Sequence, residues 1–531
     1  MYDGFNLSKG IAVFLALILL AGCLAISSWN TPEFFPSVDE TDLRQDEEVP
    51  EGSIRYELNG GLFADGRSDT YFTEIPDLTH HIRANTAQGN DIVREGFTLL
   101  GWNTEPDGSG MHVGLGSRVT MEEGLTLYGE WAEWTDPAAF TYEEHTETGG
   151  IKLTGYYGEK NLDRLVIPET IDGKTVTVIG KKCVEKADIH TLVLSKGIKT
   201  VERHAFSQCG ISEIVLFDNI TVITNTSFGG SIRTVHINAV QPPRHILTDD
   251  NAHFTEDMDR LILYADQKKM VFFAGCSMSY GLNSKTVSET FPDYVVCDMG
   301  SVGGTNAWFQ FECMLPYLRE GDLFIHAPED NSPYQLMYDI EAEPRMFVMV
   351  ENNYDLLSLC DFSECASFFD YFATFNRDRQ EDAACSYSDW NPNYNEYGDY
   401  AVFRSASNEN AYFGLTVTYC TEYLTDEAFA VLNSYYDRIA QKGARVFFSY
   451  APINSNALSE EDRAGLIWAV FAGQVYKKLA GHARVISEVT DYQMGGRFFY
   501  DEDYHLTSEG ADIRTRRLIR DIQSALGSQS R

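Results

Sequence analysis

The sequence predicts a multidomain chain in which two small β-rich modules precede an α/β domain with a doubly wound parallel sheet. Its 531 residues are too many for a single hydrophobic core. Short apolar triplets recur through residues 138–242, which is typical of a repeat architecture. From residue 262 onward, continuous apolar runs alternate with helical stretches, as expected for a parallel sheet that is covered on both faces.

Composition and charge exclude several functions. The formal net charge is −38, so the chain lacks the clustered Lys and Arg that bind a phosphate backbone or an anionic bilayer. We therefore expect no nucleic-acid partner and interpret the acidic surplus as a solubilising surface. The ten cysteines include no Cys-x-x-Cys pair, and Cys360 with Cys365 is only a weak candidate for a disulfide. No metal cluster or phosphate-binding loop is visible, so we expect no cofactor and no metal.

The first 26 residues predict an outward-facing, membrane-anchored protein. An apolar run, Ile11–Ala21, is followed by Gly22 and Cys23, and Leu-Ala-Gly-Cys resembles a bacterial lipobox. That resemblance implies lipidation of Cys23. The alternative is an uncleaved membrane anchor, because apolar character continues through Leu24, Ala25 and Ile26. The whole run of about 16 residues is nevertheless short for a spanning helix, which needs roughly 20. Both interpretations place the rest of the chain outside the membrane, on a bacterial cell surface, and residues 27–52 form an acidic linker.

Residues 53–135 show short alternating strands separated by turn residues. Three segments, Tyr56–Gly61, Arg94–Trp102 and Leu125–Trp131, together resemble the Listeria–Bacteroides repeat (InlB B-repeat). The resemblance implies a small β-grasp-like module that acts as a spacer or a contact surface. We expect Trp102 and Trp131 to be core residues, with stacking on a ligand as the alternative.

Residues 138–242 carry an internal repeat. One apolar triplet occurs about every 22 residues, so stacked coils would bury one another's faces. The triplets are Leu165–Ile167, Leu192–Leu194, Ile214–Leu216 and Val235–Ile237. The block resembles BspA-type leucine-rich repeats, which implies a surface for a protein partner. We expect Cys183, Cys209 and His204 to occupy packing or surface positions rather than to ligate a metal.

Residues 262–531 contain five apolar runs that predict the strands of the parallel sheet. They are Met270–Ala274, Tyr294–Cys297, Leu323–Ile325, Val446–Tyr450 and Val485–Ile486. In open α/β sheets, ligands bind at the carboxyl ends of the strands. Residues that take part in binding or catalysis should therefore follow these runs directly.

Four candidate residues follow these strands or precede the last helix. Ser277 follows the first strand at a turn into a helix, which would expose its hydroxyl. Gly303 follows the second strand, where the absence of a side chain lets a backbone N–H approach an oxyanion. Asn331 follows the third strand and offers an amide donor. His505 stands near the C-terminus with acidic neighbours, and a His beside a carboxylate is the base that a serine nucleophile requires.

The order Ser, Gly, Asn and Asp with His resembles the SGNH/GDSL hydrolase superfamily over residues 262–531. The resemblance implies that Ser277 is the nucleophile and that Gly303 and Asn331 are oxyanion donors. It also implies that His505 is the general base. Its carboxylate partner is open: the usual spacing selects Glu502, while Asp503, which we favour, and Asp501 are the alternatives.

Two sequence features depart from the superfamily pattern, and a long insertion interrupts the domain. Cys276 occupies the position of the usual Asp, and Asn331 follows Ala-Pro-Glu-Asp rather than Gly-x. Residues 332–425 separate the third and fourth strands and include the aromatic segment Trp390–Tyr400. We expect this insertion either to cap the substrate pocket or to be an ordered loop over the sheet edge.

Two functions remain open at this stage. The first is a cell-surface serine esterase acting on O-acyl groups of a cell-wall or exported polysaccharide, with acyl transfer as a variant that uses the same residues. The second is a surface interaction protein whose hydrolase-like domain is degenerate, with a protein partner at the repeats.

Overall fold

The computed structural model describes most of the chain beyond the N-terminal segment. The described residues are 49, 52–63, 66, 68, 71–74, 79–81, 92–120, 124–230, 232–301, 307–329, 344–387, 389–405 and 419–527. The predicted anchor with Cys23 and almost all of the acidic linker lie outside them. Among the described residues, no helix has the length and apolar character that crossing a membrane requires.

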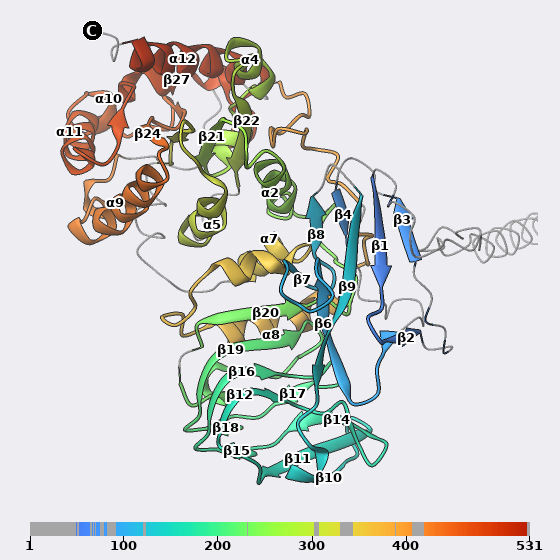
Figure 1. Cartoon of the computed structure of the whole chain (residues 1–531). Coiled ribbons are helices and arrows are strands. Elements are labelled where there is room, and N and C mark those ends of the chain that lie inside the picture. The colour runs from blue at the N-terminus through green and yellow to red at the C-terminus, as the bar shows by residue number, and fades with distance from the viewer. Residues whose placement is uncertain are drawn as a thin grey trace, which may run out of the picture.

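The first module is a mixed β-sheet at one side of the molecule (Figure 1). Its main sheet has the order β3-β1-β9-β6-β7, with β1 parallel to β9 and β6 antiparallel to it. Trp102 is 1% exposed and packs edge-on against Tyr56, so it is a core residue as predicted. Trp131 is only partly buried. The strands are β1 Ser53–Glu57, β2 Leu62–Phe63, β3 Tyr71–Glu74, β4 Thr79–His81, β5 Ile92–Val93, β6 Phe97–Asn103, β7 His112–Val113, β8 Arg118–Thr120 and β9 Leu125–Glu133.

The second module is a solenoid of stacked parallel strands. The predicted triplets pair in register, because Leu165 lies opposite Leu192, Leu192 opposite Ile214, and Ile214 opposite Val235. All four side chains are fully buried, so each coil covers the apolar face of the next. The strands are β10 Phe140–His145, β11 Gly150–Tyr156, β12 Asn161–Val166, β13 Thr170–Ile171, β14 Lys174–Ile179, β15 Val184–Glu185, β16 Asp188–Val193, β17 Thr200–Val201, β18 Phe206–Ser207, β19 Gly210–Phe217 and β20 Thr234–Asn238.

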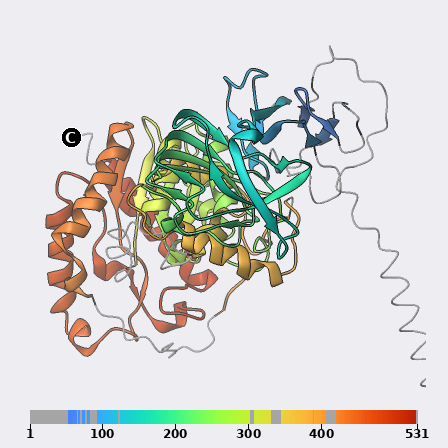
Figure 2. The same ribbon diagram turned by 90° about the horizontal axis from the view of Figure 1, so that it is seen from below.

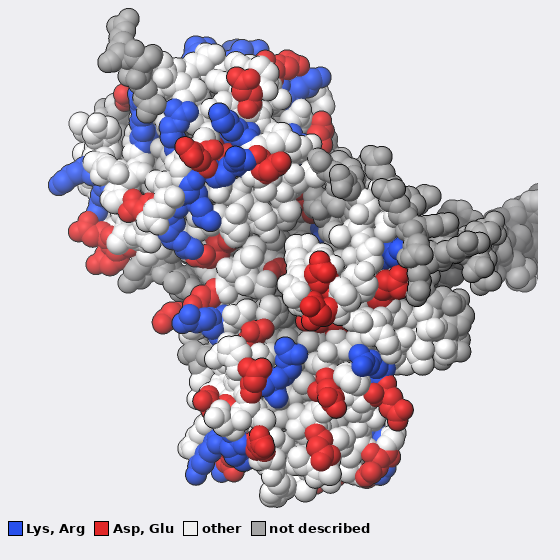
Figure 3. All heavy atoms as spheres, viewed as in Figure 1, with Lys and Arg blue, Asp and Glu red and all other residues white. Residues whose placement is uncertain are grey.

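The first module and the solenoid share buried surface. Leu100 and Ala132 of the first module pack with Val166, Val193 and Val215 of the solenoid. Seen from below, the strands of the first module and the helices near the C-terminus lie at opposite sides of the molecule (Figure 2). On the face shown in Figure 3, Lys and Arg are interspersed with Asp and Glu, and the described residues there form no continuous basic surface.

The C-terminal part is an α/β unit with the parallel sheet order β22-β21-β23-β24-β26. Its strands coincide with the five predicted apolar runs, and all of their pairings are parallel. Because the chain passes from β21 to β22 on one side and then to β23 on the other, the carboxyl ends of β21 and β23 mark the point where ligands bind in such sheets. The strands are β21 Lys269–Ala274, β22 Val295–Gly300, β23 Leu323–His326, β24 Arg445–Phe448, β25 Ile453–Asn454, β26 Arg484–Val485 and β27 Gln493–Met494.

Helices cover both faces of this sheet. Helix α12 packs against α4 on one side, and α9 lies against β24. The helices are α2 Phe254–Leu263, α3 Cys276–Ser279, α4 Ser284–Thr290, α5 Ala307–Met314, α7 Pro344–Val350, α8 Phe368–Asp378, α9 Asp426–Gln441, α10 Glu460–Arg463, α11 Ile467–Leu479 and α12 Ser508–Gly527. The 3-10 helices of this part are η4 Leu315–Tyr317, η5 Tyr354–Leu359, η6 Arg379–Glu381, η7 Thr421–Tyr423, η8 Val489–Tyr492 and η9 Gly496–Phe498.

The long insertion divides into two halves with different positions. Its first half, residues 344–381, covers the end of the solenoid: Phe369 packs on Phe228, and Asn376 Nδ2 donates to Ile220 O at 2.9 Å. The expectation of a cap over the substrate pocket is wrong for this half. The apolar face of α8, with Phe368 and Phe372, is buried and completes the core of the last coil instead.

The second half lies along the edge of the sheet. Tyr397 O accepts a hydrogen bond from Asp298 N, in the edge strand β22, at 2.8 Å. Tyr400 N donates to Ser279 O at 2.9 Å, next to the turn after β21. This half therefore covers the sheet edge and also approaches the carboxyl ends of the strands.

Helix α2 carries three buried carboxylates, on Glu256, Asp257 and Asp259. Arg118 of the first module contacts two of them: its Nε lies 2.5 Å from Asp259 Oδ2, and its Nη1 lies 3.5 Å from Glu256 Oε1. Burial outweighs the effect of Arg118 and raises the pKa of Glu256 to about 8. Glu256 therefore keeps its proton in the folded protein at a pH where the unfolded chain has lost it.

We expect the free energy of unfolding of Glu256→Gln to depend less on pH than that of the wild type. Between the ordinary pKa of 4.5 and the folded value of about 8, the folded state binds the proton more tightly, so stability falls as pH rises. The wild type should lose up to about 1.4 kcal/mol per pH unit in this window relative to the variant. Urea denaturation at pH 5 and pH 8 measures the difference, with the exposed Glu427→Gln as control. Parallel pH curves for wild type and Glu256→Gln would contradict the assignment.

Candidate active site

The turn after β21 is held by a carboxylate from the neighbouring strand. Glu329, three residues beyond β23, accepts hydrogen bonds from Gly275 N at 3.1 Å and from Ser277 N at 3.0 Å. A Cβ atom on Gly275 would lie 2.5 Å from Glu329 Oε2, so this position requires glycine. The turn into α3 is therefore fixed between two adjacent strands at the predicted rim of the sheet.

Ser277 is fully buried in this turn. Its Oγ has no hydrogen-bond partner among the described residues, and its N–H is taken up by Glu329. Its carbonyl oxygen accepts from Arg514 Nη1 at 2.8 Å. The structure thus gives the predicted nucleophile no hydrogen bond to His505 within the part of the chain that it describes.

Cys276, the residue before Ser277, lies beside His505. The Cys276 Sγ, a ring nitrogen of His505 and a carboxylate oxygen of Glu502 are all within 4.8 Å of one another. Cys276 is half-buried, so its thiol is more open to solvent than the hydroxyl of Ser277. The side chain of this turn that lies beside the His505 ring is the thiol of Cys276, not the hydroxyl of Ser277 that the sequence predicted there.

His505 is oriented by Asp501. The Nδ1 of His505 lies 2.8 Å from Asp501 Oδ1, and the imidazole stacks on Tyr280 with ring centroids 3.9 Å apart. Burial alone would lower the pKa of His505, but the hydrogen bond with Asp501 and the interaction with the neighbouring Cys276 outweigh it and raise the pKa to about 10. The ring is therefore protonated at neutral pH.

The favoured carboxylate, Asp503, has a different partner. It is 1% exposed, and its Oδ1 accepts from Asn454 Nδ2 at 2.9 Å. The physical reason is the loop itself: Tyr500 N donates to His505 O at 2.9 Å, which folds the segment back so that Asp501 faces the ring. The structure therefore selects Asp501, the second candidate, to hold His505.

Aromatic side chains of the insertion complete this part of the rim. Tyr280 stacks between His505 and Tyr400, with the Tyr400 centroid at 4.2 Å. Arg404 Nη2 donates to Tyr280 O at 3.0 Å, and its Nε donates to Leu506 O at 2.8 Å. These contacts tie the second half of the insertion to both the turn and the His505 loop. They were not predicted, because no local sequence pattern pairs residues so distant in the chain.

The predicted oxyanion donors, Gly303 and Asn331, lie outside the described residues. The predicted lipidation site, Cys23, does too. Within the described part, the chemistry of the rim comes from Cys276, His505, Asp501, Glu502 and Glu329. Such a set offers a nucleophilic thiol, an acid–base imidazole and carboxylates that orient both.

Comparison with known proteins decides the nature of the solenoid. Residues 151–250 match the family model of the BspA type leucine rich repeat region, in six copies. This segment is a BspA-type leucine-rich repeat region. None of the curated proteins matches the chain.

One similar solved structure is the X-ray crystal structure of the protein YXIM from Bacillus subtilis. It is 11% identical, with a TM-score of 0.25, and the match covers 49% of this chain and 57% of that one. The chain thus spans little more than half the length of that protein.

In the leucine-rich repeat region, Cys183, Cys209 and His204 occupy packing or surface positions, as expected. Cys183 and Cys209 are buried, and burial raises the pKa of Cys183 to about 12. His204 is an exposed residue with a φ of 61° in a turn between coils. Cys360 and Cys365 of the insertion are also buried. We assign no chemistry to these positions.

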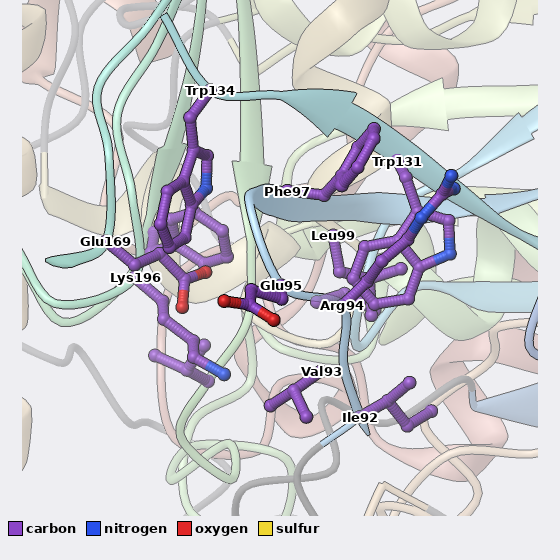
Figure 4. Close-up of a pocket in the computed structure, with 13 residues that line it drawn as sticks. Ile92, Val93, Arg94, Glu95, Phe97, Leu99, Trp131, Trp134, Glu169 and Lys196 are labelled. Atoms are coloured by element: carbon purple, nitrogen blue, oxygen red, sulfur yellow. The ribbon is translucent and has the colours of Figure 1, made fainter. Parts of the chain in front are cut away.

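A cavity lies where the first module meets the leucine-rich repeat region (Figure 4). Trp131 and Trp134 line opposite sides of it, and Glu169 and Lys196 of the repeats contribute charged groups. The indole nitrogens donate to Leu58 O and to Thr98 Oγ1. Both tryptophans are therefore tied to their own module, which is consistent with a packing role at this junction.

Proposed function

We propose that the α/β domain hydrolyses an acyl ester through a covalent acyl-enzyme, with Cys276 as nucleophile and His505 as acid and base. What carries the proposal is the sequence of contacts from Cys276 to His505 to Asp501, because this is the relation of nucleophile, base and orienting group in triad hydrolases. An imidazolium next to a thiol favours the thiolate, which is the nucleophilic form. Ser277, the nucleophile implied by the resemblance to SGNH/GDSL hydrolases, remains the competing assignment.

The reaction would proceed in two balanced steps. The thiolate of Cys276 attacks the ester carbonyl, the bond to the alcohol oxygen breaks, and the imidazolium of His505 gives its proton to the departing alkoxide. Water then attacks the thioester while His505 removes its proton, which releases the carboxylic acid and restores the Cys276 thiolate and the His505 imidazolium. An acceptor alcohol in place of water would make the same site an acyltransferase. The oxyanion would need donors other than Ser277 N–H, which Glu329 already binds.

We further propose that the substrate carries O-acyl groups and belongs to a cell-wall or exported polysaccharide. This follows from the predicted lipobox, which would hold the domain outside the membrane, and from Tyr280, which stacks on His505, with Tyr400 of the insertion stacked on Tyr280. Aromatic rings suit the apolar faces of sugars. The first module, which resembles the Listeria–Bacteroides repeat, would then act as a spacer.

Covalent labelling distinguishes the two nucleophiles. We expect iodoacetamide to modify Cys276 faster than Cys420, another half-buried thiol, as read by peptide mass mapping. Cys276→Ala should lower turnover of 4-nitrophenyl acetate by on the order of 10⁴-fold, while Ser277→Ala and Cys420→Ala keep it. Labelling of Ser277 by a fluorophosphonate, together with an active Cys276→Ala variant, would instead assign the serine.

A binding role is the second candidate, and the leucine-rich repeat region favours it. Repeat solenoids offer extended surfaces for protein partners, and the first module adds a second exposed surface. If neither Cys276→Ala nor Ser277→Ala changes the turnover of small esters, the hydrolase proposal fails and the binding role is preferred.

A further inference from the structure

Three side chains with different donor atoms converge at the rim of the sheet. Cys276 Sγ, a Glu502 carboxylate oxygen and a His505 ring nitrogen lie within 4.8 Å of one another. The Nδ1 of His505 is occupied by Asp501, so the free donor is Nε2. This atom is buried, has no hydrogen-bond partner among the described residues, and lies 3.8 Å from Glu502 Oε2.

These donors match the preferences of zinc. Zn²⁺ binds thiolate, imidazole and carboxylate in tetrahedral sites, and sites with three protein ligands keep a fourth position open. Ligand atoms around such an ion are about 3.3 to 3.8 Å apart, given bond lengths of about 2.0 to 2.3 Å. For an imidazole nitrogen and a carboxylate oxygen the expected separation is about 3.3 to 3.5 Å, so the 3.8 Å between Nε2 and Glu502 Oε2 has to shorten slightly on binding. The Glu502 side chain is 56% exposed, so it is able to rotate inward.

The surroundings of His505 also suit a metal ligand. Histidines that bind metals usually donate their other ring N–H to a carboxylate, which fixes the tautomer and the ring orientation. Asp501 provides that carboxylate at 2.8 Å, and stacking on Tyr280 holds the ring plane. Half-buried Cys276 and exposed Glu502 leave a path for the ion from solvent.

We propose that Cys276, Glu502 and His505 bind a Zn²⁺ ion, and that the bound ion blocks the reactivity of the Cys276 thiol. Binding forms a zinc–sulfur bond with Cys276, and the proton on Nε2 of the imidazolium leaves as this nitrogen joins the ion. Metal and protons therefore compete for the site. The inhibitory effect rests on the function proposed above, whereas the binding itself does not.

Calorimetric titration of the full chain with zinc chloride, after treatment with EDTA and dialysis, tests the binding. We expect one Zn²⁺ per chain that requires this cluster. Cys276→Ala and His505→Ala should each weaken binding more than 100-fold, and Asp501→Asn by about 10- to 100-fold, the usual cost of losing an outer partner. Glu502→Gln should weaken binding, and Glu509→Gln, with a nearby exposed carboxylate, should not. Unchanged zinc binding by Cys276→Ala would overturn the proposal.

Chemical protection gives a second measurement that does not depend on catalysis. Bound zinc should slow alkylation of Cys276 by iodoacetamide but leave alkylation of Cys420 unchanged, as read by mass mapping of the two peptides. In Glu502→Gln, protection should need a higher zinc concentration. Equal protection of both thiols, or of neither, contradicts the site. Zinc binding in a protein without ester turnover would refute the hydrolase proposal alone, and turnover without binding would refute the zinc site alone.

Discussion

Replacement of His505 by Ala is expected to lower the turnover of a small acyl ester by on the order of 10³-fold, because general acid–base catalysis typically contributes this much. The imidazole would serve both steps, first as acid toward the leaving alkoxide and then as base toward water. Asp501→Asn should cause a smaller loss, since Asn keeps the shape of the side chain but not the charge that holds the protonated ring. Steady-state rates with 4-nitrophenyl acetate, measured in EDTA to exclude zinc, provide the comparison.

Asp503→Asn is the matched control for this series. Asp503 is two residues from both Asp501 and His505, and the hydrogen bond of its carboxylate runs to Asn454. We expect Asp503→Asn to keep turnover close to that of the wild type. The reverse result, with Asp503→Asn inactive and Asp501→Asn active, would restore the carboxylate favoured from sequence and reject the geometry of the His505 loop.

The second large effect concerns stability and the junction of the leucine-rich repeat region with the insertion. Arg379 is 1% exposed and bridges two buried carboxylates: its Nη2 lies 2.7 Å from Asp218 Oδ2 and its Nη1 lies 2.8 Å from Glu351 Oε1. Arg379→Met would remove the cation between the two carboxylates and leave Glu351 with His245, whose Nδ1 lies 2.7 Å from Glu351 Oε2, as its remaining basic partner. Breaking a buried ion pair in this way typically costs about 3 to 5 kcal/mol. Urea denaturation followed by far-UV circular dichroism should show the loss.

Arg377→Met is the control, on the same helical segment. Arg377 is exposed, and its Nη1 donates to Thr221 O at 2.7 Å. Its Nη2 also donates to Thr374 Oγ1 at 3.0 Å. Because both hydrogen bonds are exposed, we expect a loss of about 1 kcal/mol, well below that of Arg379→Met. Equal losses for the two variants would mean that the buried network does not stabilise the junction.

The periodic parts of the fold were predictable because their signals are local. Leu165, Leu192, Ile214 and Val235 recur at nearly constant spacing, and this spacing alone aligns them in neighbouring coils. The apolar run Met270–Ala274 likewise predicts a strand buried on both faces. Trp102 needed only its size and its place in a small module to be recognised as a core residue.

The site could be predicted only in part, because its geometry depends on how distant loops close. Sequence spacing between Asp501, Asp503 and His505 does not reveal the hydrogen bond between Tyr500 and His505 that turns the loop back. The resemblance to serine hydrolases implies Ser277 as the nucleophile and gives no role to Cys276. A thiol at a strand-to-helix turn was visible in the sequence, but only its position beside His505 gives it meaning.

For a related reason, the sequence did not show that the two halves of the insertion pack on different surfaces. Phe368 and Tyr400 both belong to an aromatic-rich stretch, and composition alone does not state which surface each will cover. The end of the repeat stack offers an apolar face, whereas the sheet edge offers unpaired backbone groups. Which segment meets which surface is settled by long-range packing, for which the sequence has no periodic signal.

The divided insertion connects the leucine-rich repeat region to the α/β domain. One continuous loop reaches from the last repeat coil, at Phe228 and Ile220, to the ring stacked on His505. An α/β domain cut from the chain at residue 262 would expose the phenylalanines of α8 to solvent. It would also lose the contacts with the repeats that hold the insertion in place, and with it the stacking of Tyr400 on Tyr280. The repeats and the α/β domain are therefore expected to be inherited together as one unit, and a change in the number of coils would require a matching change in the loop.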